Sequence, residues 1–241
     1  MSDLLLVQDE DRVRTLTLNR PANLNAISEA LLDALAEGLL DAAADPAVAT
    51  VLLTGSGRAF SVGADLFEMA QRNADPAGFQ LGKHGFLGVL DAMVSLPKPL
   101  IMAVNGLALG AGTTFLGYAD LVFMSSEARL KCPFTDLAVA PEAASSFLLP
   151  RLIGRQNAAW VLTSSEWNSA AEAQERGLAG KESAPEEQGQ LAKRHDRVRA
   201  SKKSSRLAEN KDTRRAGQRE ARATARTRES AHDRRRKGRD S

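Results

Sequence analysis

The sequence has 241 residues, of which 43% are hydrophobic and 26% charged, and its formal net charge is +2. That value hides two opposite parts: residues 1–180 carry 12 Lys and Arg against 20 Asp and Glu, a net of −8, whereas residues 181–241 carry 20 against 10, a net of +10. The second part has no aromatic residue and only three large apolar ones. Three such residues cannot offset the entropy of ordering that segment. We therefore predict a folded core over residues 1–180 and a charged, helical C-terminal region over residues 181–241.

Cysteine usage and hydropathy exclude several protein classes. Cys132 is the only cysteine, so an intramolecular disulfide is impossible and a reducing compartment is favoured. The first residues lack a basic region ahead of an apolar run, so a secretory signal is not predicted. The longest apolar stretch, residues 100–111, is too short to span a bilayer. We expect a cytoplasmic protein without a membrane segment, and His195 and His232 lack the spacing of metal ligands, so we expect no metal.

Apolar runs and turn signals predict the elements in chain order. Strands are expected at residues 4–7 and 13–18 around a turn at residues 8–12, and then at residues 48–53, 100–104 and 121–124. Ser28 is expected to cap a helix that ends at Asp45-Pro46. Its apolar face consists of Leu31, Leu32, Leu35, Leu39 and Leu40.

Further helices follow the glycine-rich segment at residues 106–112. One runs on to Tyr118, and two short helices are expected at residues 145–149 and 155–162. Ser169 and Glu172 fit a capping box for a last helix, and Gly177 fits the position after its end. Strands that alternate with helices indicate an α/β domain with parallel strand pairing.

Two glycine-bearing loops follow buried strands: GSGRAFSVGADLFEM at residues 55–69 and NGLALGAGTTFLGYAD at residues 105–120. Glycine lets the backbone approach a ligand closely, and a helix N-terminus offers unpaired N–H groups. One N–H from each loop could stabilise a developing oxyanion. The alternative is that these glycines serve only turns and close helix packing. Neither loop is a dinucleotide or phosphate-binding fingerprint.

Several short motifs occur together in a fixed order: NRP with LNA at residues 19–26, AFSVGADL at 59–66, PKP at 97–99, VNG at 104–106 and GAG at 110–112. Over residues 3–180 the chain resembles the crotonase superfamily, which is the enoyl-CoA hydratase/isomerase family. This resemblance implies an α/β spiral of ββα units with a C-terminal helical region. It also implies a homo-trimer or a dimer of trimers, with a coenzyme A thioester as substrate and no further cofactor.

The resemblance also implies site residues at matching motif positions. The backbone N–H groups of Ala64 and Ala111 would form the oxyanion hole. The residues implied to contact CoA or the substrate are Asn25, Ala26, Val62, Gly63, Asp65, Leu66, Gly110, Thr114 and Phe134. Hydratases of the family use two glutamates, and the matching positions here are Thr114 and Phe134. Neither side chain transfers a proton at neutral pH, which argues against ordinary water addition.

Glu142 is the one charged residue of LAVAPEAASSFLLP, residues 137–150. The PEAASS segment resembles the Δ3-Δ2-enoyl-CoA isomerase branch, where a single glutamate in this segment is catalytic. Moving a double bond from β,γ to α,β requires one proton taken and one returned, which a single carboxylate can do. A dry setting would raise its pKa towards the useful range. The alternative is a surface loop acid after a proline.

Other interpretations stay open. The chain could be an enoyl-CoA hydratase, catalyse another reaction of the same enolate chemistry, or bind CoA esters without catalysis. The +10 region could bind nucleic acid through its basic residues, although it has no aromatic residue to stack on bases. Asp65 and Glu68 suit roles at a helix start, and His84 suits a structural role. Residues 67–89 are expected to line the acyl pocket.

Overall fold

The computed structural model describes residues 3–183 of the chain. Ten strands in this part form two sheets. The larger has the order β1 (Leu5–Glu10), β2 (Val13–Leu18), β3 (Thr50–Gly55), β5 (Leu100–Val104), β7 (Leu121–Ser125) and β10 (Lys181–Ser183). The smaller has the order β4 (Ala59–Ser61), β6 (Leu107–Leu109), β8 (Arg129–Lys131) and β9 (Asn168–Ser169). Only the β1–β2 and β8–β9 pairs are antiparallel.

Seven α-helices and two 3₁₀ helices connect the strands of the described part. They are η1 (Pro21–Asn23), α1 (Glu29–Ala44), α2 (Leu66–Ala74), α3 (Gly85–Ser95), α4 (Ala111–Thr114), η2 (Phe115–Tyr118), α5 (Ser145–Ile153), α6 (Arg155–Thr163) and α7 (Ala170–Glu175). No described helix is long and apolar enough to cross a membrane.

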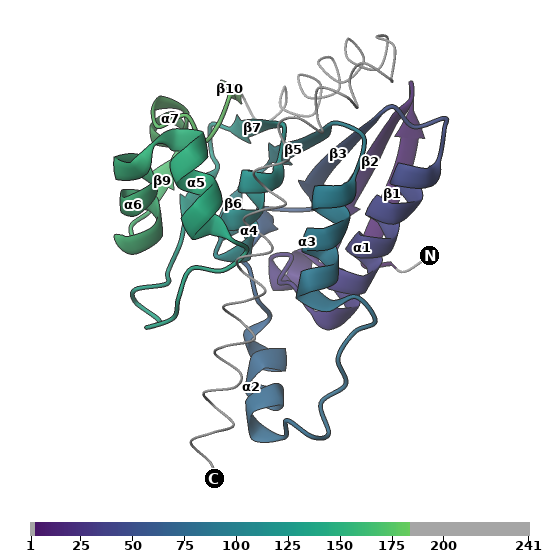
Figure 1. Ribbon diagram of the computed structural model, residues 1–241, viewed down its shortest axis with the longest axis horizontal. Coiled ribbons are helices and arrows are strands. Elements are labelled where there is room, and N and C mark those ends of the chain that lie inside the picture. The colour runs from purple at the N-terminus through teal and green to yellow at the C-terminus, as the bar shows by residue number, and fades with distance from the viewer. Residues whose placement is uncertain (1–2, 184–241) are drawn as a thin grey trace.

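The same ββα unit occurs three times in succession. A strand of the larger sheet (β3, β5, β7) is followed by a strand of the smaller sheet (β4, β6, β8) and then by a helix. The predicted α/β class with parallel pairing is therefore confirmed. In Figure 1, α1 and α3 lie side by side over one face of the larger sheet, and α5, α6 and α7 gather at the other end of the molecule.

The core explains why the central strands are apolar throughout. In β5, Leu100, Met102 and Val104 belong to the main core, whereas Ile101 and Ala103 belong to a smaller cluster on the opposite face. Strands buried on both faces read as continuous apolar runs rather than as an alternating pattern. The predicted boundaries of β2 and β5 are correct, and those of β3 are shifted by two residues.

Three predicted elements need correction. β1 continues to Glu10, so the turn before β2 is shorter than expected. Leu40 is 45% exposed, because it is turned about half a circle around α1 from Leu31. Residues 181–183, assigned to a helical region, form strand β10 beside β7, and the rest of that region lies outside the described residues.

Predicted caps are confirmed at two helices. Ser28 Oγ accepts the N–H of Leu31 at the start of α1. Ser169 and Glu172 form the reciprocal capping box of α7, with bonds of 3.2 and 2.8 Å. Gly177, just after that helix, has φ = +81°, a conformation that favours glycine. Local sequence was sufficient to predict these caps, because each capping residue is adjacent in the chain to the helix that it caps.

Helix α3 is capped instead by a carboxylate from another helix. The side chain of Asp33, on α1, accepts the backbone N–H groups of Lys83, His84 and Gly85 at 2.8, 2.7 and 3.3 Å. Although burial alone would raise the pKa of Asp33, these bonds lower it below its ordinary value of 3.8. The neighbouring carboxylate of Glu29 accepts the N–H of Gly82 at 2.9 Å. Helix α1 therefore fixes the segment that leads into α3.

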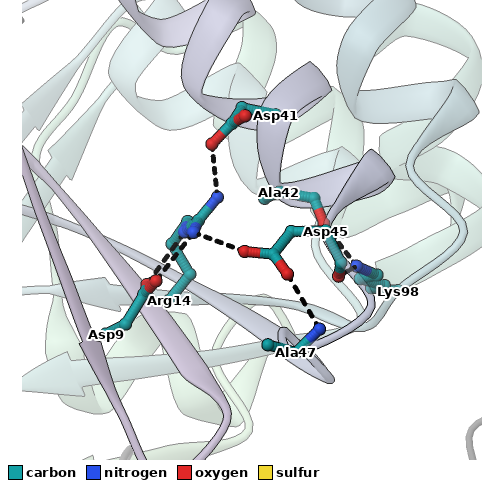
Figure 2. A network of polar contacts seen from close by, with 7 residues as sticks. All are labelled: Asp9, Arg14, Asp41, Ala42, Asp45, Ala47 and Lys98. Atoms are coloured by element: carbon teal, nitrogen blue, oxygen red, sulfur yellow. Dashed lines mark hydrogen bonds and ion pairs between the residues drawn. The ribbon is translucent and has the colours of Figure 1, made fainter.

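An ion network holds the opposite end of α1 (Figure 2). Arg14, on β2, is 6% exposed and contacts Asp9, Asp41 and Asp45 at 2.6–2.9 Å. Hydrogen bonding to Asp9 raises the pKa of Arg14 and lowers that of Asp9. The Lys98 ammonium donates to carbonyl oxygens at the C-terminal end of α1, where cations are favoured. This end of the helix is thus tied to β2, whereas Glu29 and Asp33 hold the segment before α3.

Replacing Asp33 by alanine should lower the free energy of unfolding by about 1–2 kcal/mol, as for a lost helix cap. Because the folded pKa of Asp33 is lowered, its contribution is present above pH 3.8 and is lost as the pH falls through the folded value. Urea unfolding at pH 7 and at pH 3 measures both effects. Glu37→Gln, one turn along the same helix, keeps the Asp33 cap and alters only the contacts of the Glu37 carboxylate with the side chains of Lys83 and His84, so it serves as the control. Equal losses in the two variants would contradict the capping role.

Candidate active site

A cavity of about 550 Å³ brings together the two glycine-bearing loops and the segment that contains Glu142. Ala64 from the first loop, Ala111 from the second and Glu142 all line it. These three residues are distant in the sequence but share one wall of the cavity. No group of three or more His, Cys, Asp or Glu within residues 3–183 is arranged to hold a metal ion.

The first loop presents the backbone of Ala64 to the cavity. Ile27 donates its N–H to the carbonyl of Gly63 (2.8 Å) and accepts the N–H of Asp65 (3.1 Å), which makes a parallel bridge opposite Ala64. In such a bridge the intervening residue directs its own N–H and C=O to the other side. Ala64 is exposed there, on the cavity side.

The second loop turns directly from β6 into α4. Gly110 has φ = +49°, and its N–H donates to the carbonyl of Lys131 at 3.0 Å. Thr113 Oγ1 donates to the carbonyl of Ala108 at 2.7 Å, which ties α4 back to β6. Ala111 is the first residue of α4, and the first N–H groups of a helix have no acceptor within the helix.

The two loops touch each other at glycine. A Cβ atom on Gly63 would lie 2.7 Å from the carbonyl oxygen of Leu109 and 3.2 Å from the nitrogen of Ala111. Gly63 also has φ = +78°. A side chain at this position would force the loops apart, so glycine permits both backbones to reach the same cavity.

The carboxylate of Glu142 lies over the second loop. A Cβ atom built on Gly110 would be 3.6 Å from Glu142 Oε1. Burial raises the pKa of Glu142 from 4.5 to about 7. No described residue donates a hydrogen bond to this carboxylate or forms an ion pair with it, so nothing offsets the burial. The alternative of a solvated surface acid does not fit this position.

Some residues expected to contact CoA or the substrate have their side chains in the protein interior. Asn25 is 0% exposed. Its Oδ1 accepts the N–H of Arg20, and its Nδ2 donates to the carbonyls of Ser56 and Ala59, at 2.8–2.9 Å. Ala26 is 8% exposed and does not line the cavity. The residue of this segment that does is Ile27, whose position depends on the bridge to the first loop.

Thr114 and Phe134 also lie in the core, with 0% and 5% exposed surface, and neither lines the cavity. Val62 is half-buried and donates its N–H to the carbonyl of Leu24. None of these three residues lines the cavity, and their expected contacts with CoA or the substrate stay a prediction. Thr114 is the last residue of α4, and its Oγ1 donates to the carbonyl of Ala111 within the same helix at 3.5 Å.

Asp65 begins α2 and closes the first loop. Its carboxylate accepts the N–H groups of Phe67 and Glu68 and contacts Arg20 at 2.9 Å. Although burial would raise the pKa of Asp65, the Arg20 bond and these N–H groups lower it. Glu68 accepts the N–H of Glu29, so it caps α1 in turn. Helix-start roles for Asp65 and Glu68 are therefore confirmed. Leu66 is 70% exposed and does not line the cavity.

The remaining wall of the cavity comes from α2, the irregular segment that follows it and the start of α3. Its apolar members are Met69 on α2, Phe79 and Leu81 in the irregular segment, and Phe86 and Leu87 on α3, so residues 67–89 contribute to the cavity lining. Glu29, Glu68, Arg72 and His84 add polar groups. Sequence reasoning did not identify these individual residues, because the segment shows no regular periodicity and is held by Glu29 and Asp33 of α1.

Cys132 lies behind the site and is not a nucleophile. It is fully buried, and burial, with a contribution from the nearby Glu142 charge, raises the pKa of its thiol to about 12. The thiol therefore stays protonated at neutral pH.

Comparison with known proteins places this geometry among enzymes. The family model for enoyl-CoA hydratase/isomerase matches residues 8–241. The 1,2-epoxyphenylacetyl-CoA isomerase of Escherichia coli is 34% identical over 183 residues, which are 74% of this chain and 69% of that protein. Enoyl-CoA delta isomerase 2 of Rattus norvegicus is 35% identical over 176 residues, which are 72% of this chain and 44% of that protein.

Solved structures of enzymes from the same family are also similar to this chain. An enoyl-CoA hydratase from Mycobacterium marinum has a TM-score of 0.84 and 59% identity, covering 88% of this chain and 99% of that one. An enoyl-CoA hydratase/isomerase from Pseudoalteromonas atlantica has a TM-score of 0.86 and 31% identity, covering 95% and 89%. The similar proteins carry both hydratase and isomerase names, so similarity alone does not choose the reaction.

The raised pKa of Glu142 predicts a pH-dependent cost to folding. The folded state holds the proton more tightly than the unfolded state, so stability should fall as the pH rises from 4.5 to about 7. Glu142→Gln should remove this fall and be more stable than the parent above pH 7 by up to about 3 kcal/mol, at roughly 1.4 kcal/mol per pKa unit. Denaturant unfolding from pH 4 to pH 8 measures the difference, with the exposed Glu127→Gln as control. Parallel profiles for parent and Glu142→Gln would contradict a buried acid.

Proposed function

The chain belongs to the enoyl-CoA hydratase/isomerase family of enzymes, and we propose that it moves a double bond of an acyl-CoA thioester from the β,γ to the α,β position. The observation that carries this proposal is the position of Glu142. It is a single, half-buried carboxyl group whose pKa is raised by desolvation to about 7, and it lines one cavity with the backbone of two loops.

Glu142 would act first as a base and then as an acid. The carboxylate takes the α proton of a 3-enoyl thioester, and the electron pair of the C–H bond moves into an enolate. As the enolate collapses, a double bond forms between the α and β carbons and the β,γ bond is lost. The γ carbon then takes the proton from the Glu142 carboxylic acid. One carboxyl group is sufficient because it is regenerated in each turnover.

The enolate oxygen would accept hydrogen bonds from the N–H groups of Ala64 and Ala111. Each is left without an acceptor by its local structure, one by the bridge to Ile27 and the other by the start of α4. Donors that are already oriented stabilise charge that develops in the transition state without reorganising. The exposed Ala64 and Leu66 would border the thioester and the CoA, with Gly63, Gly110 and Asp65 shaping that path.

A hydratase is the second candidate, favoured by the names of relatives such as the enoyl-CoA hydratase from Mycobacterium marinum. Water addition in this family uses two carboxyl groups, and the matching positions here hold Thr114 and Phe134, both buried away from the cavity. This favours the isomerase. Non-catalytic binding of CoA esters, combined with nucleic-acid binding through the basic region, depends on residues outside the described part.

We also propose that the protein assembles as a trimer or a dimer of trimers. Helix α2 supports this proposal because none of its residues is buried, although it carries Leu66, Phe67 and Met69, which are 46–72% exposed. In Figure 1, α2 projects away from the two sheets. Apolar side chains gathered on one projecting helix suit an interface between copies.

Incubation with a 3-enoyl-CoA should give the conjugated 2-enoyl-CoA, and Glu142→Gln should lower kcat by about 10²–10⁴-fold, as for loss of a general base. The kcat of the parent should rise with pH through about 7, because the carboxylate is the reactive form. Chromatography of the products follows the reaction, and the same assay with a 2-enoyl-CoA detects 3-hydroxyacyl-CoA.

Turnover retained by Glu142→Gln would refute the role of Glu142 as the base. Hydration faster than isomerisation would favour the hydratase. Glu29→Gln, another acid of the cavity, is the control and should keep most of the activity.

A further inference from the structure

The backbone just after Glu142 adopts an unfavourable conformation. Ala143 and Ala144 both have φ = +52°, in the left-handed region, and both are buried. This region is disfavoured for residues with a Cβ atom, and two such alanines in succession need support from elsewhere in the structure. The bend determines where the Glu142 side chain points.

Hydrogen bonds to the bend come from two sources. The carbonyl oxygens of Glu142 and Ala144 accept N–H groups from the beginning of α5 at 2.9–3.0 Å, so these bonds are local. The carbonyl of Ala143 instead accepts the hydroxyl of Tyr118 at 2.8 Å, across 25 positions of sequence. This bond is buried, and Tyr118 is 1% exposed. The tyrosine therefore ties the bend to a different part of the fold.

Tyr118 belongs to the same helical segment as Ala111. Helix α4 begins at Ala111 and continues without a break into η2, which ends at Tyr118. This segment is in close contact with α5, since a Cβ atom on Gly117 would lie 3.3 Å from Leu148 Cβ. One end of a short rigid segment thus offers the Ala111 N–H, and the other end holds the bend that carries Glu142.

We propose that Tyr118 is a positioning residue, whose hydroxyl holds the Ala143 carbonyl and thereby keeps the Glu142 carboxylate over Gly110, at a fixed place relative to the Ala111 N–H. This inference rests on the proposed function, because it takes Glu142 to be the catalytic base. Without the hydroxyl, the bend is free to leave the left-handed conformation. The carboxylate then moves away from the second loop and towards water.

The first test is Tyr118→Phe, which keeps the ring and removes the donor. The kcat for isomerisation should fall about tenfold or more, because small displacements of a catalytic group are costly, while KM should change less than about twofold. The acid limb of kcat should move to lower pH as Glu142 gains water. The other titratable groups at or behind the cavity, which this substitution does not alter, are Glu29, Asp65, Glu68, Arg72, His84 and Cys132.

Thr54→Val is the matched control. It also removes one hydroxyl bond of 2.8 Å to a backbone carbonyl, that of Ala103, between β3 and β5 and away from the cavity. Both variants should lose similar stability in denaturant unfolding, but only Tyr118→Phe should lose kcat. Unchanged kcat and an unshifted pH profile in a folded Tyr118→Phe would overturn the proposal.

A second test does not change the shape of the core. Tyr118 is the only tyrosine of the 241 residues, so growth on a fluorinated tyrosine whose phenol ionises near neutral pH alters this hydroxyl alone. A phenolate cannot donate to the Ala143 carbonyl. The kcat of this protein should fall at alkaline pH where the parent stays active. The same kcat profile for both proteins, over a pH range in which the absorbance of the phenolate is present, would contradict the role of the hydroxyl.

The two proposals fail in different ways. If Glu142→Gln keeps full turnover, the proposed function is wrong. The positioning role is then decided by NMR titration of Glu142, whose pKa should fall in Tyr118→Phe from its value of about 7 in the parent. If Glu142→Gln is inactive and Tyr118→Phe is not impaired, only the positioning role is wrong.

Discussion

The site depends on contact between two backbones, that of Gly63 in the first loop and that of residues 109–111 in the second. A single Cβ atom at Gly63 would lie 2.7 Å from a carbonyl oxygen of the facing loop, so the contact exists only because that atom is absent. The contact also sets the separation of the Ala64 and Ala111 N–H groups. Two donors on separate loops act together only when their spacing is constant, and main-chain packing provides a more rigid spacing than side chains would.

The repeated ββα unit explains why these loops meet. In each unit the chain leaves the larger sheet, adds a strand to the smaller sheet and then enters a helix or loop on the same side. Because β4, β6 and β8 are neighbours in the smaller sheet, the segments that follow them are neighbours as well. The first supplies Ala64, the second Ala111 and the third Glu142. Helix α1 adds the wall opposite, through its carboxylate caps on the segment before α3.

A carboxyl group without a partner in this setting is costly for stability and useful for chemistry. Burial keeps the pKa of Glu142 near 7, so both protonation states are accessible at neutral pH, as a group that takes and returns a proton requires. The left-handed bend at Ala143 and Ala144 is a second cost at the same place. Strain and desolvation concentrated beside one side chain are common at functional sites, where the surrounding fold compensates for them. Here the Tyr118 hydroxyl and the start of α5 supply that compensation.

Local sequence determined much of the fold and part of the site. Apolar runs located β2 and β5, cap residues located the starts of α1 and α7, and the motifs singled out Ala64, Ala111 and Glu142, which line one cavity. In each case the signal lies within a few residues of the feature. Tertiary structure decided the rest: that Asn25, Thr114 and Phe134 face the interior, that Ile27 lines the cavity, and that Asp33 caps α3 across some 50 positions of sequence. No local pattern predicts these features, because each depends on groups that only folding brings together, and the same holds for the pKa of Glu142, which is a property of its burial.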